Sequence, residues 1–162
     1  MNCFTVLKKV QKSKFKAAGG NFAIVASRYN QVYVDSMVKA ARRALLDAGA
    51  SKIQVVRVPG AFEIPVVAAR LAKSFDFSAI ICLGVILRGA TTHAQNIAEA
   101  VSDGLVKLQI VTEVPVIHEV LLLENPKQAE ARCLGRDHNR GTEAALTALE
   151  MARVMRQLSA SE

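Results

Sequence analysis

One ten-residue segment combines residue types that bind anions with a histidine that can transfer protons. Residues 84–93 have the sequence GVILRGATTH, and the part from Gly89 to Thr92 lies where a helix is expected to begin. Free backbone N–H groups and the positive end of a helix bind anions there, and the threonine hydroxyls and Arg88 add donors. His93 falls in the first helical turn, where it can give and take protons near neutral pH. The segment predicts an anion site with a proton donor beside it, although an ordinary capped helix with a surface histidine also fits these residues.

Aromatic and acidic residues follow two other apolar runs. Residues 59–65, PGAFEIP, place Phe62 and Glu63 directly after a β-branched run, and Tyr29 follows the first apolar run of the chain. Tyr29 can stack on a planar ring, but a half-buried core tyrosine is the alternative, as is a turn with Phe62 in the core.

Residues 132–141 are rich in charge and glycine, so they predict either a cationic phosphate site or a solvated loop.

The sequence lacks the signatures of several other sites. Neither the Walker motif G-x-x-x-x-G-K-[ST] nor G-x-G-x-x-G occurs, so nucleotide binding by these routes is unsupported. Three cysteines, Cys3, Cys82 and Cys133, without a C-x-x-C pair argue against a disulfide framework or a zinc site and fit a reducing cytoplasm. No apolar run reaches membrane-spanning length, and no signal-peptide core follows the basic start. We expect a cytoplasmic chain that needs no metal and no membrane.

Apolar periodicity predicts the elements that must position these residues. Short apolar runs predict strands at 22–26, 53–58, 79–83 and 114–123. Helical spacing predicts helices from an Asn30 cap to near Gly49, at 62–73, from Thr92 onward, after 125–126 and at 142–158. Thr92 and Gln95 have the spacing of a capping box, and Gly84 to Gly89 are expected to form a loop.

Strands that alternate with helices predict an α/β fold. We expect a three-layer α/β/α sandwich with a flavodoxin-like, four-stranded parallel sheet. Ligands bind beyond the carboxyl ends of such strands. The expected ends, at 27–30, 58–63, 84–93 and from about His118, contain the residues described above.

The charge is concentrated at the start of the chain. Of the formal net charge of +7, five charges come from lysines in the first 20 residues, which contain no acid. We therefore divide the chain into a basic N-terminal arm, 1–20, and one domain, 21–162. No nucleic-acid-binding motif or aromatic interleaving accompanies the arm, so we expect no nucleic-acid partner. A solvated tail and an arm that binds another subunit remain the interpretations.

Several segments together resemble the 6,7-dimethyl-8-ribityllumazine synthase family. The resemblance covers about residues 21–155, nearly the whole chain beyond the arm. Its motifs, in chain order, are RYN at 28–30, VPGAFEIP at 58–65, LG at 83–84 with RGATTH at 88–93, VPVI at 114–117, QA at 128–129 with Arg132, NRG at 139–141 and EAA at 143–145. Each motif alone is modest, but their order and spacing make the resemblance specific.

The resemblance implies a condensation of 5-amino-6-(D-ribitylamino)uracil with 3,4-dihydroxy-2-butanone 4-phosphate, without a cofactor. It implies that His93 donates protons and that Ala90 and Thr91 bind the phosphate, together with Arg132 of a neighbouring subunit. It further implies a homo-pentamer with sites between adjacent subunits, which can assemble into an icosahedral capsid. The residues implied to hold the ribitylamino-uracil are Tyr29, Ala61, Phe62, Glu63, Val85, Ile86, Leu87 and His118.

Four positions depart from the family pattern, the mildest being Arg140, which stands where lysine is common. His118 stands where a phenylalanine usually packs on the pyrimidine, and Ala94 and Gln95 replace an aromatic residue and an acid after His93. Histidine stacks less strongly than phenylalanine, and Gln95 can only form hydrogen bonds, where an acid could orient His93 or raise its pKa. A homologue that binds flavin or lumazine with weak or no catalysis, or one whose capsid is its function, is therefore the alternative hypothesis.

Overall fold

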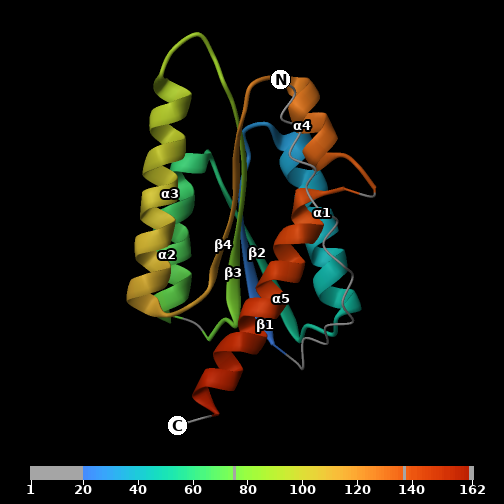
Figure 1. Ribbon diagram of the computed structural model, residues 1–162, viewed down its shortest axis with the longest axis vertical. Helices are drawn as coiled ribbons and strands as arrows, with labels where there is room; N and C mark the ends of the chain where they lie inside the picture. Colours follow the sequence, from blue (N-terminus) through green and yellow to red (C-terminus); the bar gives the residue numbers. More distant parts are fainter. Residues whose placement is uncertain (1–19, 75, 137, 161–162) are drawn as a thin grey trace, which may run out of the picture.

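The computed structural model describes residues 20–74, 76–136 and 138–160, and its centre is a parallel sheet of four strands. The strands are β1 (Asn21–Ser27), β2 (Lys52–Val58), β3 (Ala79–Leu87) and β4 (Val116–Leu123), in the spatial order β2-β1-β3-β4. All three neighbouring pairs run parallel. The predicted four-stranded parallel sheet is confirmed, and its carboxyl edge lies at the top of Figure 1.

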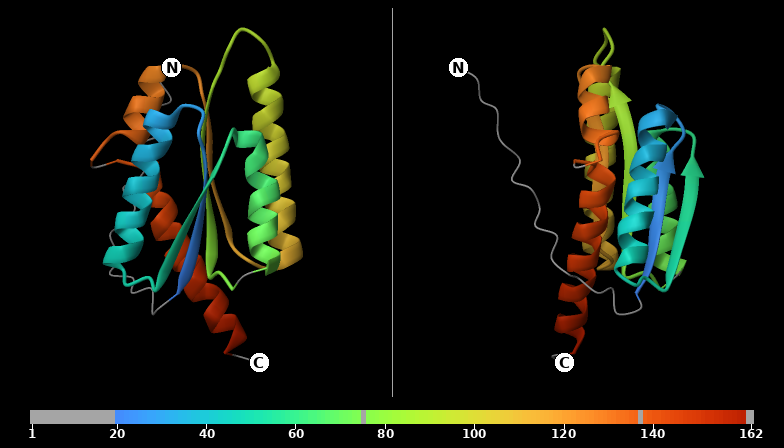
Figure 2. Two further views of the ribbon diagram at one scale, coloured as in Figure 1. Left: turned by 180° about the vertical axis from the view of Figure 1, so that it is seen from behind. Right: turned by 90° about the vertical axis from the view of Figure 1, so that its right-hand side faces the viewer.

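Helices cover both faces of the sheet (Figure 1). The 3-10 turn η1 (Ala61–Glu63), α2 (Ile64–Ser74) and α3 (His93–Thr112) pack on one face. On the other face lie α1 (Gln31–Asp47), α4 (Pro126–Cys133) and α5 (Arg140–Ser159). The last turns of α5 run past the amino-terminal edge of the strands (Figure 2). The three-layer sandwich that we expected is therefore confirmed.

The alternation of side chains along β1 creates two hydrophobic cores. Phe22, Ile24 and Ala26 belong to the core under α1 and α5, whereas Ala23 and Val25 belong to the core under α2 and α3. A strand that is buried on both faces needs apolar residues at every position, which explains its continuous apolar run.

The loop predicted at Gly84 to Gly89 is wrong, because β3 continues to Leu87. Val85 to Leu87 pair with Leu121 to Leu123 of β4, as their β-branched and aliphatic side chains favour. Gly84 serves packing and makes no turn: an added Cβ would lie 3.1 Å from Val120 Cγ1 and 3.3 Å from Ile64 Cδ1. The longer strand carries the anion-binding candidates further from the centre of the sheet.

The expected caps of two helices differ from the structure. Asn30 precedes α1 but makes no side-chain cap, and Thr92 precedes α3 without a capping hydrogen bond. Gln95 bonds to Glu99 and Arg88, so the predicted capping box is absent, and Thr91 Oγ1 instead accepts the His93 N–H at 3.4 Å. The Asn30 amide bonds to the Val85 carbonyl and Gln95 bonds to Arg88 and Glu99, so neither side chain caps a helix.

Three other boundaries shift by two residues. The helix expected at 62–73 begins at Ile64, because the residues before it form η1. The strand expected from 114 begins at Val116, since Pro115 has no N–H to donate to a ladder. The last helix begins at Arg140, ahead of the expected residue 142, because Asn139 Oδ1 accepts the Gly141 N–H at 2.9 Å.

The remaining expectations concern the chain as a whole. The basic arm lies outside the described residues, apart from Gly20. Within residues 20–160, leaving out 75 and 137, no helix is both long and apolar enough to cross a membrane. Cys82 and Cys133 are buried and free, and burial raises the pKa of the Cys82 thiol.

Candidate functional site

The segments that follow β1 and β2 are joined by backbone hydrogen bonds. The Arg28 N–H donates to the Val58 carbonyl at 2.9 Å, and the Tyr29 N–H donates to the Pro59 carbonyl at 3.1 Å. The Tyr29 ring lies over Gly60, where an added Cβ would be 3.0 Å from Tyr29 Cδ2. The two aromatic segments singled out in the sequence thus meet at the carboxyl edge of the sheet.

Tyr29 and Phe62 expose their rings at this edge. Tyr29 is 69% exposed and Phe62 is 60% exposed, so neither is a core residue. The Glu63 carboxylate is held nearby, because Oε2 accepts the Gly60 N–H at 2.8 Å. Exposed aromatic rings beside an oriented carboxylate can bind a planar ligand that carries hydrogen-bond donors.

The end of β3 is tied to this platform by Asn30. Its amide Nδ2 donates to the Val85 carbonyl at 2.7 Å, and Asn30 itself has a left-handed backbone with φ of 56°. Val85 is buried, whereas Ile86 and Leu87 are partly exposed. Tyr29, η1 and the end of β3 therefore form one continuous surface across three neighbouring strands.

The anion-binding candidates follow β3 at the same edge. Ala90 and Thr91 are exposed, and their backbone N–H groups donate no hydrogen bond to the described part of the chain. His93 is the first residue of α3, and its imidazole is exposed. Open N–H groups at the start of a 20-residue helix, with an imidazole next to them, are suited to an anionic substrate.

Arg88 does not face this anion site as a free cation. Its Nε donates to Glu124 Oε1 at 2.9 Å and its Nη2 donates to Gln95 Oε1 at 3.0 Å. The Gln95 amide also donates to Glu99 at 2.7 Å. Gln95, which departs from the family pattern, is thus part of a link between the ends of β3 and β4 and the first turns of α3.

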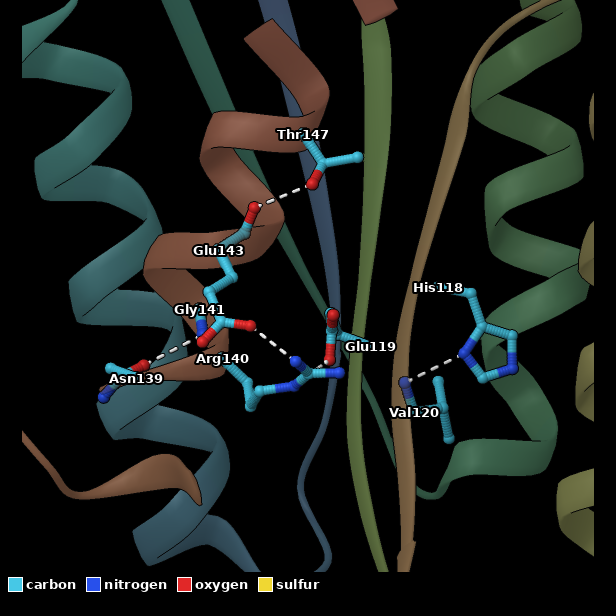
Figure 3. A network of polar contacts seen from close by, with 8 residues as sticks. All are labelled: His118, Glu119, Val120, Asn139, Arg140, Gly141, Glu143 and Thr147. Atoms are coloured by element: carbon cyan, nitrogen blue, oxygen red, sulfur yellow. Dashed lines mark hydrogen bonds and ion pairs between the residues drawn. The ribbon is translucent and has the colours of Figure 1, made fainter. Parts of the chain in front are cut away.

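His118 lies inside β4 and faces α3, not at the strand end where we expected the ligand segment to begin. Its Nδ1 accepts the Val120 N–H at 3.3 Å (Figure 3). Its Nε2 lies 2.8 Å from Ser102 Oγ. Ser102 Oγ donates to the Ala98 carbonyl, so the ring fits a neutral state with the proton on Nε2. Removal from water lowers the pKa of His118 further, which keeps the ring neutral.

Arg132 lies in the last turn of α4 and is exposed. Helix α4 packs on α1, α5 and β4, whereas α3 packs on α2, η1, β3 and β4 (Figure 1). Arg132 and the start of α3 therefore belong to opposite faces of the same sheet. A single chain brings Tyr29, Phe62, Glu63, Val85 and His93 to one edge, but Arg132 is not on the same face as His93.

The structure adds a polar cluster that sequence reasoning missed. Arg140 donates from Nε to Glu119 Oε2 at 3.1 Å and from Nη1 to Glu143 Oε2 at 2.5 Å (Figure 3). Burial raises the pKa of Glu119 to about 7; Arg140 opposes this rise and Glu143 adds to it. The sequence hints at this cluster only through Glu119, a charged residue within a predicted strand. Periodicity alone does not tell whether such a residue faces the protein or lies exposed at the edge of the sheet.

Comparison with known proteins places the chain in a family. The sequence profile of the family described as 6,7-dimethyl-8-ribityllumazine synthase matches residues 19–156. A protein of that name from Stenotrophomonas maltophilia strain R551-3 is 45% identical over 139 residues, 85% of this chain and 90% of the relative. Another, from Xylella fastidiosa strain 9a5c, is 44% identical over 145 residues, 88% of this chain and 94% of the relative.

A third relative of the same name, from Xanthomonas oryzae pv. oryzae strain PXO99A, is 45% identical over 139 residues, 85% of this chain and 90% of the relative. The similarity thus extends through all four strands and all five helices, and includes every segment that forms the carboxyl-edge site. The chain belongs to the 6,7-dimethyl-8-ribityllumazine synthase family.

Proposed function

We propose that the chain condenses 5-amino-6-(D-ribitylamino)uracil with 3,4-dihydroxy-2-butanone 4-phosphate to 6,7-dimethyl-8-ribityllumazine, the penultimate step of riboflavin biosynthesis. One observation carries the assignment of the site. An exposed aromatic platform, Tyr29 with Phe62, shares the carboxyl edge with open N–H groups and His93 at the start of α3. A planar substrate and a phosphorylated substrate can therefore bind side by side.

The ribitylamino-uracil binds between the ends of β1, β2 and β3. Tyr29 and Phe62 contact the pyrimidine, and Glu63 accepts hydrogen bonds from the substrate. Ala61 and the β3 residues Val85, Ile86 and Leu87 line the same site. His118 contributes the face of a neutral ring, because both of its nitrogens are engaged within the chain.

The phosphate of the second substrate binds at Ala90 and Thr91. Their N–H groups and the positive end of α3 supply donors without a metal ion. Arg132 of an adjacent subunit completes the site, because Arg132 of the same chain lies on the opposite face of the sheet. A guanidinium binds phosphate through two parallel N–H donors, which orients the leaving group.

The reaction needs orientation and proton transfer and no redox change. The uracil amine attacks the ketone carbonyl, and loss of water gives an imine. Loss of the proton on carbon 3 and departure of phosphate from carbon 4 leave an enol, which becomes a new carbonyl as carbon 4 takes up a proton. Attack of the ribitylamino nitrogen on this carbonyl closes the ring with loss of a second water. His93, at the start of α3, shuttles the protons that these steps release and take up.

An oligomer supports this arrangement. Val66 on α2 and Val106, Ile110 and Val111 on α3 are exposed, Ile110 by 70% and Val111 by 77%. Large exposed aliphatic side chains on adjacent helices are typical of protein interfaces. We propose a cytoplasmic homo-pentamer in which these helices contact the next subunit, and further assembly of such pentamers into a capsid.

The two-substrate assay tests this function directly. Purified protein with both substrates is expected to form a fluorescent lumazine, and His93→Ala is expected to slow its formation by about a hundredfold. Formation at the uncatalysed rate would overturn the proposal. Tight riboflavin binding by calorimetry together with that result would favour the alternative of a flavin- or lumazine-binding homologue.

A further inference from the structure

We propose that a groove between α1 and the edge strand β2 binds a compact polyphosphate, such as the phosphate chain of a nucleoside triphosphate. The groove has a volume of about 520 Å³ and is lined by six residues of α1, from Asp35 to Leu46, and by Arg57 of β2. Its residues and its ligand differ from those of the condensation site, so the inference does not depend on the proposed function.

The groove extends away from the carboxyl edge of the sheet. Helix α1 begins at that edge with Gln31 and runs toward the opposite edge (Figure 1). Asp35 and Arg57 lie at the end of the groove nearer the carboxyl edge, and Leu46 lies at the far end. At a rise of about 1.5 Å per residue, Arg42 stands about 16 Å along the axis from the start of the helix. A ligand bound at Arg42 is therefore separate from the aromatic platform.

Two of the four cations in the groove have a carboxylate partner. Arg57 forms an ion pair with Asp35 and also donates from Nη1 to the Ser27 carbonyl at 3.2 Å. Arg43 Nε lies 3.0 Å from Asp47 Oδ1, and the two side chains of this pair are 79% and 63% exposed. Exposed ion pairs add little stability, so the Arg43 guanidinium can exchange its partner for an anion that carries more charge.

The other two cations, Lys39 and Arg42, are exposed and form no ion pair with any residue that the structure describes. Lys39, Arg42 and Arg43 fall within about one turn of α1, so their positions differ by at most about 6 Å along the helix axis. Like charges at this spacing repel each other. An anion bound among them removes that repulsion, so the groove favours a ligand with several negative charges.

The close spacing of these cations favours linked phosphates over an acidic peptide. An extended peptide presents carboxylates to one side only at every second residue, about 7 Å apart. Linked phosphates carry their charges on neighbouring oxygens, so one short chain can contact all three cations. A guanidinium binds phosphate oxygens through two parallel N–H donors, whereas a lysine acts as a point charge. Arg42 and Arg43 would therefore orient the phosphates, and Lys39 would add charge.

The apolar part of the groove suits an organic group attached to the phosphates. Val38 in the lining is 7% exposed, and Leu46 at the far end is 56% exposed. The volume of the groove lies within the range of about 300 to 1,000 Å³ that is typical of small-molecule sites. A nucleoside triphosphate has both parts, since its phosphate chain meets the cations and its base or sugar meets Leu46.

The basic arm of the chain does not suit this groove. Residues 1–20 carry five lysines and no acid. Gly20, the first described residue, accepts the Ser51 N–H through its carbonyl at 3.0 Å, directly before β2. The arm therefore joins the domain beside the edge strand. Its charge is repelled by the cations of the groove and adds to the field that attracts a polyphosphate.

Isothermal titration calorimetry of the assembled protein tests the inference, with ATP, inorganic triphosphate and inorganic phosphate as probes. We expect both polyphosphates to bind at least about tenfold more tightly than phosphate, because each contacts several cations. Their Kd values should rise between about 50 mM and about 200 mM NaCl, since salt screens exposed charges. Tighter binding of ATP that is lost in Leu46→Ser would assign the site to nucleoside triphosphates, and equal affinities would assign it to the phosphate chain alone.

Two double variants separate the groove from a general effect of net charge. Lys39→Gln with Arg42→Gln removes the two unpaired cations, so the Kd for triphosphate is expected to rise at least about tenfold. Arg70→Gln with Lys73→Gln is the matched control, because it removes the same two side-chain types at the same spacing from the exposed face of α2. The Kd of this control should stay within about twofold of the native value.

The substrate phosphate site also attracts anions, so the titrations are repeated with Arg132→Ala, which should keep the triphosphate binding of the groove. Three results would each overturn the inference: polyphosphates that bind no more tightly than phosphate, equal losses in the two double variants, and loss of binding in Arg132→Ala alone. An oligoglutamate that binds as tightly as triphosphate would also overturn it, in favour of an acidic peptide.

The folding of each variant is checked by circular dichroism. If the variant without Lys39 and Arg42 does not fold, Arg42→Glu replaces it with the same expected loss, and native affinity in that variant counts against the inference. Condensation is assayed separately. A native protein that binds triphosphate and makes no lumazine contradicts the proposed function alone, and an active protein that binds no polyphosphate contradicts this inference alone.

Discussion

The side-chain amide of Asn30 donates a 2.7 Å hydrogen bond to the backbone carbonyl of Val85, which lies 55 residues later in the chain. The bond joins the turn after β1 to the last residues of β3. It also occupies a backbone acceptor in the surface that we propose binds the uracil. One residue therefore fixes the distance between the aromatic platform and the strand that leads to His93.

Two substitutions of Asn30 should distinguish how much its hydrogen bond and its left-handed backbone conformation each contribute to stability. Asn30→Gly keeps access to the left-handed φ of 56° and loses the hydrogen bond, whereas Asn30→Ala loses both. We expect a loss of about 1 kcal/mol for the glycine variant and about 2 kcal/mol for the alanine variant in urea unfolding. Both should raise the KM for the uracil, and unchanged kinetics would show that the bond has no part in the site.

Gly60→Ala should disturb the aromatic platform more than the fold. The new methyl group would lie 3.0 Å from both Tyr29 Cδ2 and Glu63 Oε2, so the ring and the carboxylate must move. We expect the KM for the uracil to rise about tenfold, with a loss of stability below about 1.5 kcal/mol. An increase in the KM for the ketone alone would contradict this placement of the uracil.

Mixing two inactive variants should reveal whether the site spans two chains. His93→Ala and Arg132→Ala damage different halves of the site, and in one chain these residues belong to opposite faces of the sheet. Random co-assembly after joint refolding should restore both residues at about a quarter of the sites, so activity should recover to about a quarter of the native value. No recovery in co-assembled oligomers, checked by light scattering, would place both residues in one chain.

Gly141→Ala should destabilise the protein strongly. An added Cβ would lie 2.0 Å from the Met37 carbonyl oxygen, because the start of α5 touches the backbone of α1. Backbone cannot give way as a flexible side chain can, so we expect a loss of about 3 kcal/mol in chemical unfolding. Thr147→Ala is the control on the same helix: it removes an exposed hydroxyl and should change stability by less than about 0.5 kcal/mol.

Ionisation of Glu119 should lower the stability of the native protein as the pH rises from about 4.5 to about 7. The folded state raises the pKa of Glu119 to about 7 from an ordinary value of 4.5, so it holds that proton more tightly than the unfolded chain. The resulting stabilisation is complete below the unfolded pKa and is lost as the pH rises through the folded pKa. Glu119→Gln cannot ionise, so it should gain about 2 kcal/mol over the native protein at pH 8.

Unfolding curves between pH 4.5 and pH 8 provide the measurement, because the unfolded and folded pKa values of Glu119 bracket the loss of stability. The lowered pKa of His118 has the opposite effect on the pH dependence of stability. The stabilisation from a neutral His118 is lost as the pH falls through that pKa. His118 is present in both the native protein and Glu119→Gln, so the difference between their curves isolates the contribution of Glu119. Equal pH dependence in the native protein and in Glu119→Gln would contradict the raised pKa of Glu119.

Local pattern was sufficient for the elements and for the edge at which the site lies. The apolar run from Phe22 to Ala26 predicted β1, and the spacing of Val34, Met37, Val38, Ala41 and Leu45 predicted the buried face of α1. Glycine was misleading at Gly84, where the neighbours Val120 and Ile64 require a small residue and no turn is made. Periodicity reports which side chains are buried, but it cannot report what they touch.

The sequence by itself determined the family, the order of strands and helices, and the meeting of Tyr29, Phe62 and Glu63 near His93, because parallel strands end at one edge. Only the tertiary structure decided the partners of the polar groups: Asn30 with Val85, Arg88 with Glu124, and Arg140 with Glu119. These partners are 55, 36 and 21 residues apart, and local spacing carries no information about such distances. A polar side chain bonds to whatever partner the packing of helices on the sheet brings within reach, and that choice depends on the whole fold.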